Sequence, residues 1–403
     1  MRPIDYLNEL SFVRRGGSKE ERRAAEMIAR WLSDIGYTPQ LEEFDIYSFE
    51  PGWGTLTPLS PSGEEIKVRP VGLSADGDVE GEIFRMFFPK PEFVNPDDIR
   101  GKIVFMQHYP RWKWMKLFVE SGVKACVIVL ANHRENSTIA LSQKTAKDFG
   151  DKIPLATMSF EKAISLVQND VPRIRLKTSH KKFFARSQNV VCELPGDTDR
   201  MILFTAHYDS TPCSPGAQDN AAGTAELIEV MKNFAGKKFR RTMRFIFCGS
   251  EEMGLLGSKH YANSHIDELE RVDFLINLDV GGDPFTPICV RTLGTDAVFN
   301  YIDGILKRNG IYGAVEQDIY SSDGMPFGKY GVPSLSIARS GIDGKGHSPF
   351  DEAKNVCDVS LKEVVETALI IAEDIANAKI LPFERKISDE MKKKVKKYFD
   401  ERR

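Results

Sequence analysis

The segment MILFTAHYDS, residues 201–210, decides the fold. It begins with an apolar run of strand length and then changes to polar side chains, with His207 and Asp209 two positions apart. Polar groups at the carboxyl end of a strand lie in the crevice where open α/β sheets bind their ligands. The segment therefore predicts a buried strand that carries a histidine and an aspartate to a functional site.

The same pattern of strand and helix recurs through the second half of the chain. Apolar runs predict strands at 189–194, 243–248, 274–278 and 332–337, and helical periodicity follows Asp219, follows Glu252 and covers 296–308 and 361–378. Near the N-terminus, a capping box of Ser18 and Glu21 begins an amphipathic helix that ends at Gly36. This alternation predicts an α/β fold with a doubly wound, mixed but mainly parallel sheet flanked by helices.

A smaller α/β module interrupts this pattern. A strand at 101–106, a helix at 112–121 and a strand at 125–130 follow a turn-rich stretch at 47–73. With 403 residues, two domains or one domain with a large insertion are expected. We assign 1–48 and 187–383 to the main domain and 49–186 to the insertion. Residues 384–403 form an amphipathic C-terminal helix that docks on its own domain, with a subunit contact or, more remotely, membrane binding as alternatives.

Composition narrows the function classes. The formal net charge of −3 argues against a general nucleic-acid binder, which needs a basic excess. No stretch is long and apolar enough to span a bilayer, and the N-terminus lacks the apolar run of a secretory signal. The six cysteines are scattered without C-x-x-C pairs and are interpreted as reduced. These features predict a cytoplasmic protein with no membrane span.

Acids follow three successive predicted strands. Asp219 lies in GAQDNAAGT, residues 216–224, Glu251 and Glu252 follow the strand at 243–248, and Asp279 follows the strand at 274–278. Taken singly, Asp219 or Asn220 reads as a helix cap and the glutamate pair as a solvated helix start. Three strands in succession that end in acids are hard to explain as caps. One glutamate can bind metal while the other acts as a base.

Two histidines lie at strand exits beside glycine or acid. These are His207 and His347, the latter in GHSPFD, residues 346–351. In H-x-D, alternate residues point the same way, so Asp209 can contact the ring nitrogen of His207 that faces away from a metal. The remaining histidines have no such context and are interpreted as ordinary surface or partly buried residues: His108, His133, His180, His260 and His265.

This set of residues resembles the co-catalytic di-zinc exopeptidase family, which includes bacterial leucyl aminopeptidases, glutamate carboxypeptidase and glutaminyl cyclase. The resemblance covers roughly 18–42 and 188–378, and the insertion resembles a protease-associated domain through its Gly-Lys-Ile-Val strand at 101–104 and later segments. The resemblance implies metal ligands at five positions, a catalytic base and a catalytic aspartate. The implied metal ligands are His207, Asp219, Glu252, Asp279 and His347. The implied base is Glu251, and the implied catalytic aspartate is Asp209.

A metal content and a reaction follow from this resemblance. Asp219 would bridge two divalent ions, with His207 and Asp279 completing one site and Glu252 and His347 the other. Three carboxylates and a bridging hydroxide balance four positive charges, and imidazole and carboxylate ligands favour zinc, with cobalt or manganese as alternatives. The expected function is a zinc aminopeptidase that acts on peptides with a free N-terminus, using a di-metal-activated bridging water and Glu251 as general base.

Other functions stay open at this point. A carboxypeptidase or small-amide deacylase could use the same centre, and it would need a cation such as Arg339 for the substrate carboxylate, although this arginine can equally brace a loop. Glutaminyl cyclase activity and a non-catalytic, receptor-like binding protein are further alternatives. The sequence leaves open the preferred N-terminal residue, the native metal and whether the chain forms a homo-oligomer.

Overall fold

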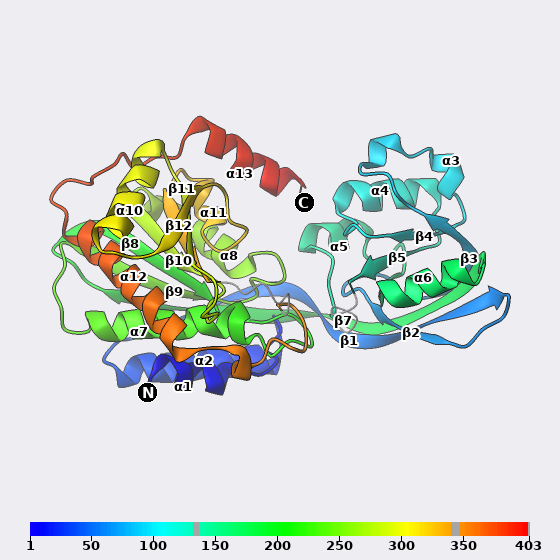
Figure 1. Cartoon of the computed structure of the whole chain (residues 1–403), viewed down its shortest axis with the longest axis horizontal. Helices are drawn as coiled ribbons and strands as arrows, with labels where there is room; N and C mark the ends of the chain where they lie inside the picture. The colour runs from blue at the N-terminus through cyan, green and yellow to red at the C-terminus, as the bar shows by residue number, and fades with distance from the viewer. Residues whose placement is uncertain (132–136, 340–345, 402–403) are drawn as a thin grey trace. The chain divides into compact units, whose positions relative to one another are not determined.

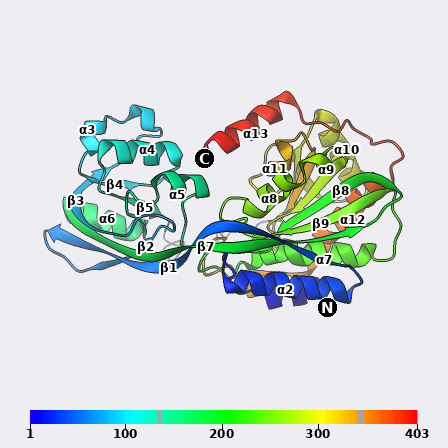
Figure 2. The same cartoon turned by 180° about the vertical axis from the view of Figure 1, so that it is seen from behind.

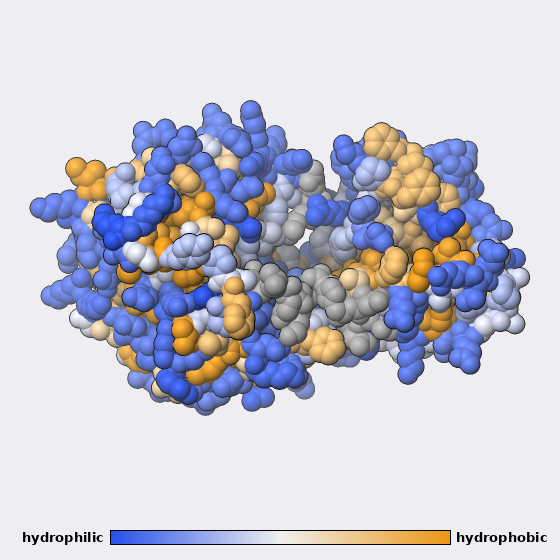
Figure 3. Space-filling view, in the orientation of Figure 1, coloured by the Kyte–Doolittle hydropathy of each residue, from blue (hydrophilic) through white to orange (hydrophobic). Residues whose placement is uncertain are grey.

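The computed structural model describes residues 1–131, 137–339 and 346–401 and divides the chain into two compact units (Figure 1). The first unit comprises Met1–Asp45 and Arg186–Tyr398, and the second comprises Ile46–Ala185 and the end of the chain after Tyr398. Two long strands contribute residues to both units: β1 (Gln40–Ser60) and β7 (Arg173–Leu194). On the face drawn in Figure 3, hydrophilic side chains cover much of each unit.

The sheet of the first unit has the strand order β7-β9-β8-β10-β13-β11-β12. Its central strands are β9 (Arg241–Cys248), β8 (Thr198–His207), β10 (Val272–Leu278) and β13 (Ser334–Ala338), and all four are parallel. Beside them, β7 runs antiparallel to β9 and β11 (Ile288–Leu293) runs antiparallel to β13, whereas β12 (Gly313–Gln317) is parallel to β11. The expected mixed, mainly parallel sheet is confirmed. The chain goes from β8 outward to β9 and then back across β8 to β10, so the winding direction reverses at β8.

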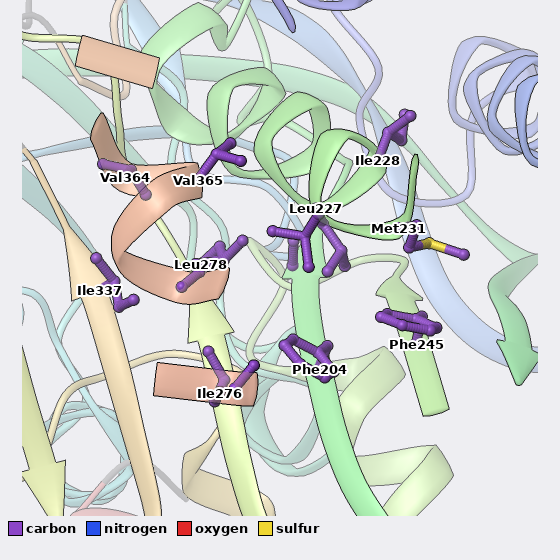
Figure 4. Packing of buried hydrophobic residues seen from close by; sticks show 14 of the residues in the cluster. Phe204, Leu227, Ile228, Met231, Phe245, Ile276, Leu278, Ile337, Val364 and Val365 are labelled. Carbon is purple, nitrogen blue, oxygen red and sulfur yellow. The ribbon is translucent and has the colours of Figure 1, made fainter. Parts of the chain in front are cut away.

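Helices cover both faces of this sheet. One layer consists of α1 (Pro3–Leu10), α2 (Lys19–Asp34), α7 (Ala222–Phe234), α10 (Asp296–Arg308) and α12 (Asp358–Asn377). Its apolar residues form the largest core cluster, and Figure 4 shows part of that cluster, where Leu227 and Val365 approach Phe204 and Ile276 of the strands. Burial of this apolar area is the main force that fixes the layer on the sheet.

The other face carries shorter helices. These are α8 (Leu256–Ser264), α9 (Ile266–Leu269) and α11 (Met325–Gly328), and a second cluster around Leu203, Ile246 and Phe327 lies beneath them. The last helix, α13 (Asp389–Glu401), follows at the end of the chain. Its Met391 and Val395 side chains and the preceding Ile387 are buried, and Lys394 Nζ lies 3.0 Å from Asp318 Oδ1 of the same unit. These contacts favour docking of this segment on its own unit.

The second unit is a smaller α/β body. Its strands β2 (Ile66–Pro70), β3 (Gly77–Arg85), β4 (Ile103–Met106), β5 (Ala125–Leu130) and β6 (Leu155–Ser159) pair in the order β2-β6-β5-β4-β3, and the last four named are mutually parallel. Its helices are α3 (Pro96–Ile99), α4 (Trp112–Ser121), α5 (Gln143–Phe149) and α6 (Phe160–Gln168). Figure 2, the view from behind, also shows the long strands β1 and β7. The resemblance of this unit to a protease-associated domain stays a prediction.

The predicted elements match the structure where apolar runs are strong. The helices expected at 112–121 and 296–308 have those bounds, and Ser18 caps α2 by accepting a hydrogen bond from the Glu21 amide at 3.1 Å. The strands β11 and β12 were not predicted. The strand β12 lies at the sheet edge with β11 beside it, and polar residues interrupt both, so neither has a continuous apolar run. None of the helices in the described ranges is both long and apolar enough to cross a bilayer.

Candidate metal centre

The four parallel central strands of the first unit bring their carboxyl ends to one edge of the sheet. His207 is the last residue of β8, Glu251 and Glu252 follow β9, and Asp279 follows β10 directly. His347 comes from the segment after β13, and Asp219 from the loop between β8 and α7. Because the winding reverses at β8, the helices diverge there and leave room for these side chains.

Asp219 lies between the two histidines. Its Oδ1 is 3.1 Å from Nε2 of His207, and its Oδ2 is 2.9 Å from Nε2 of His347. The Oδ1 of Asp279 is 3.3 Å from His207 Nε2, and Oε2 of Glu252 is 3.2 Å from His347 Nε2. Each oxygen of Asp219 therefore faces a different histidine, and each histidine has one further carboxylate beside it.

These contacts define two groups that can each hold a metal ion. They are His207, Asp219 and Asp279, and Asp219, Glu252 and His347, with the ligand atoms of each group within 4.8 Å of one another. Three carboxylates held this close repel one another unless cations lie between them. The Oε1 of Glu252 is buried and accepts no hydrogen bond from any described residue. The donor set of imidazoles and carboxylates without thiolate fits zinc.

The close packing of acids and imidazoles at the centre shifts the pKa values of Asp219 and Glu251. Burial works against ionisation of Asp219, but its contacts with His207 and His347 outweigh burial and hold the pKa of this carboxyl below its usual range. For Glu251, burial raises the pKa well above its usual range, the His207 imidazole opposes that rise, and Glu252 adds to it. Glu251 belongs to neither ligand group. It is a partly buried acid beside the centre, and its role as base stays a prediction.

Asp209 supports the centre from behind. Its Oδ1 lies 3.5 Å from Nδ1 of His207, the ring nitrogen that faces away from the ligand groups. The same carboxylate accepts the backbone amides of Glu251 at 2.8 Å and Glu252 at 3.2 Å. The Asp209 carboxylate thus lies beside the His207 ring and binds the glutamate loop at the same time, a second contact that H-x-D spacing alone does not indicate.

The capping interpretation applies to Asn220 and not to Asp219. The Oδ1 of Asn220 accepts the Gly223 amide at 2.9 Å in the first turn of α7 and the Val280 amide at 3.1 Å. The amide of Asp219 instead donates to Oδ2 of Asp351 at 3.1 Å, and its carboxylate is left to face the histidines. The Asp219–Asn220 peptide bond is cis.

Several further charged residues near the centre are buried. Asp351 accepts the amides of Gln218 at 2.7 Å and Asp219, and burial raises its pKa to about 6. Burial also raises the pKa of Asp323 to about 7 and of Glu226 to about 8. The side chains of Arg14 and Glu21 are buried as well. Glu21 had been interpreted only as part of a helix cap, and an isolated acid or arginine carries no sequence signal for burial.

Two of the remaining histidines have a carboxylate beside them in the structure. Nδ1 of His180 lies 3.0 Å from Asp76 Oδ1 in the second unit. His265 lies between Glu42 and Glu268, 3.2 Å from each. In both cases the partner is distant in sequence or on a following helical turn, so strand-exit context did not reveal it. His133 lies outside the described residues.

Arg339 braces a loop. Its Nε donates to the Thr286 carbonyl at 2.9 Å, its Nη2 to the Pro284 carbonyl at 3.4 Å, and its Nη1 pairs with Glu363. Only 11% of the side chain is exposed. Of the two interpretations given for this arginine, the contacts support the loop-bracing one.

Comparisons with known proteins agree with this site. Residues 189–372 match the model of peptidase family M28. The chain is 26% identical to aminopeptidase YwaD of Bacillus subtilis over 87% of this chain and 72% of that protein. It is 32% identical to probable leucine aminopeptidase 2 of Trichophyton verrucosum, but over 47% of this chain and only 39% of that protein.

Solved structures share the fold over nearly the whole chain. BSAP, a zinc aminopeptidase from Bacillus subtilis, has a TM-score of 0.76 at 23% identity and covers 97% of this chain and 98% of its own. An aminopeptidase from Aneurinibacillus sp. strain AM-1 has the same TM-score at 22% identity, with 96% of both chains covered. The family match spans all five candidate ligands, His207 to His347. Residues 189–372 are therefore similar to peptidase family M28, and the chain shares the fold of these solved structures.

Proposed function

We propose that this chain is a zinc-dependent aminopeptidase that hydrolyses the N-terminal peptide bond of peptides. Two zinc ions would be held by His207, Asp219 and Asp279, and by Asp219, Glu252 and His347. The observation that carries the proposal is the position of Asp219, whose two oxygens lie 3.1 Å and 2.9 Å from different histidines. Relatives named as aminopeptidases support the choice of reaction.

The residues around the centre suit peptide hydrolysis. Zinc, when bound, polarises a scissile carbonyl and lowers the pKa of water. Glu251 would accept the proton of the attacking water and later pass it to the departing amine. Its raised apo pKa reflects burial among other acids, and nearby cations favour the charged carboxylate that a base requires. Asp209 would keep Glu251 in place through its backbone amide and fix the tautomer of His207.

The carboxypeptidase and deacylase alternative is less well supported. It needs a cation that can receive the carboxylate of the substrate. The candidate Arg339 already donates to two backbone carbonyls and pairs with Glu363, and little of its side chain is exposed. A substrate carboxylate would have to displace these partners.

Matched substrates test the proposal. The purified chain loaded with zinc should cleave a panel of aminoacyl 4-nitroanilides and the corresponding free-amine dipeptide amides. N-acetylated versions of the same compounds should react at least about 100-fold more slowly if the amine is a required anchor. Chelation should abolish activity, and zinc should restore it.

The outcome can also contradict the proposal. Cleavage of N-acetylated peptides that depends on a free C-terminal carboxylate would identify a carboxypeptidase. Equal turnover of free and acetylated amides would point to a deacylase. Binding of two zinc ions per chain, measured by elemental analysis, tests the metal count separately from the reaction.

A further inference from the structure

Residues 14–21, which precede α2 and form its first turn, contact both loops that carry the acids of the metal centre. One loop runs from β8 to α7 and contains Asp209 and Asp219, and the other runs from β9 to α8 and contains Glu251 and Glu252. The contacts are made by Arg14, Gly16 and Glu21. None of these three residues belongs to either ligand group.

Arg14 holds the first loop. Its guanidinium is completely buried and donates only to backbone carbonyls, those of Leu10 and Phe12 in its own segment and those of Tyr208, Pro215 and Gly216 in the loop. Its backbone amide also donates to Ser210 Oγ at 3.1 Å. Burial lowers the pKa of Arg14 to about 10, so the guanidinium remains charged at neutral pH.

Glu21 holds the second loop. Its Oε1 accepts the hydroxyls of Ser187 and Ser250, both at 2.8 Å, and its Oε2 accepts the Gly17 amide at 2.6 Å. Ser250 directly precedes Glu251 and has a positive φ of 53°. This residue sits at the turn that directs Glu251 and Glu252 toward the centre, and Glu21 fixes its side chain.

Gly16 lies against the same turn. A Cβ at this position would be 2.5 Å from Ser250 Oγ and 2.9 Å from Met253 Sδ, closer than side chains approach each other. The lack of a side chain at Gly16 therefore lets the segment reach the Ser250 turn directly.

We propose that residues 14–21 act as a positioning clamp that sets the placement of Glu251 relative to the ligands, and that Glu21 is its main positioning residue. Burying a guanidinium and a carboxyl group without pairing them with each other costs stability, so an ordinary helix start would leave both in water. Both groups instead make hydrogen bonds to the two loops that carry the acids of the metal centre. This inference rests on the proposed hydrolase function.

The clamp predicts a defect in turnover without a defect in substrate binding. Misplacement of a reacting group by about 1 Å costs on the order of 100-fold in rate. We therefore expect Glu21→Ala to lower kcat by about 100-fold, with KM and zinc stoichiometry unchanged. Glu21→Gln retains an oxygen that can accept from the two serines, so it should restore most of kcat, to within about 10-fold of the unsubstituted chain.

The matched control is Glu20→Gln. Glu20 lies in the same first turn of α2 but is exposed, so kcat should not change. The zinc-loaded full chain is assayed on the best aminoacyl 4-nitroanilide. If the unsubstituted chain shows no hydrolysis, the proposed function fails. If it is active and Glu21→Ala keeps kcat within about threefold, or loses activity only in proportion to lost zinc, the clamp is refuted.

A second variant tests the clamp if Glu21→Ala fails to fold. Gly16→Ala inserts a methyl group against Ser250 and should lower kcat by about 10-fold or more through the same turn. Gly304→Ala is its control, because nothing lies within 4 Å of a Cβ at that helical position. Normal kcat in a folded Gly16→Ala chain would overturn the proposal.

Discussion

The two units use parallel strands in different ways at their carboxyl ends. In the second unit, β4 is followed by the exposed Gln107 and His108, and β6 leads into α6 with Glu161 exposed in the first helical turn. In the first unit, the acids after β9 and β10 converge on His207 and His347. Among the described residues, groups that could hold a metal occur only in the first unit. An acid after a strand can thus be a solvated residue at a helix start or a candidate metal ligand, and its proximity to imidazoles distinguishes the two.

The largest expected effect is on kcat, in a comparison of two glutamates that each follow a strand, one in each unit. Glu251→Gln should lower kcat by about 100-fold to 10,000-fold because the base is lost, while zinc content stays normal. Glu161→Gln, at the exit of β6, should leave kcat unchanged. Steady-state kinetics with elemental analysis measures both, and comparable kcat values for the two variants would remove the distinction between the units.

A smaller effect, on zinc affinity, is expected in a comparison of two aspartates near opposite ends of β8. Asp209→Asn weakens the support of His207 and of the glutamate loop, and it should lower zinc affinity by about 10-fold to 100-fold. Asp199 is exposed near the amino end of the same strand, so Asp199→Asn should have no effect. Competition with a chromogenic chelator gives both affinities. Equal affinities would show that the position along the strand does not matter.

Buried acids of the first unit should also make its stability depend on pH. Burial raises the pKa of Glu226 in the folded chain to about 8, above its ordinary value of 4.5, so the native state binds more protons between these values. Stability therefore falls as pH rises from about 4.5 to 8. Glu226→Gln should remove roughly 2 kcal/mol of that fall between pH 5 and pH 7.

The measurement is thermal unfolding of the metal-free chain at pH 5 and pH 7. The difference in Tm between the two pH values should narrow in Glu226→Gln. Glu366→Gln, an exposed position on α12, should leave that difference unchanged. A Tm difference in Glu226→Gln as large as in the unsubstituted chain would mean that Glu226 is not held protonated.

The smallest effect is expected at the histidine after β4. His108 is exposed and lies in neither ligand group, so His108→Ala should keep kcat/KM within about twofold. His347→Ala, by contrast, removes a proposed ligand and should release zinc. Loss of zinc from His108→Ala would show that the second unit contributes to metal binding.

The sequence predicted the parts of the site that are local. The central strands at 201–206, 243–248 and 274–278 are apolar runs followed by polar residues, so His207, the Glu251–Glu252 pair and Asp279 could be placed at strand ends from the order of residues alone. Their assignment as ligands and base needed the family resemblance. The geometry of Asp219 needed the family resemblance, because its loop alone was equally compatible with a helix cap. The short strands β11 and β12 were missed because polar residues interrupt both, so neither shows a continuous apolar run.

The supporting residues could not be predicted in this way. Arg14 contacts the carbonyl of Tyr208 across 194 positions, and Glu21 contacts Ser250 across 229. Neither residue type indicates burial, and no periodic pattern connects segments so far apart. Asp351 is similar, since only the folded loops bring it to the amide of Asp219.

The separation of these partners has a consequence for synthesis on the ribosome. Residues 1–45 leave the exit tunnel well before their partners in the first unit, which begin only at Arg186. Residues 46–185 are contiguous, so they can fold as a body before α1 and α2 have partners that cover their apolar faces. The nascent chain therefore passes through a stage at which α1 and α2 are targets for chaperones, and that stage ends only when β8 and α7 have emerged.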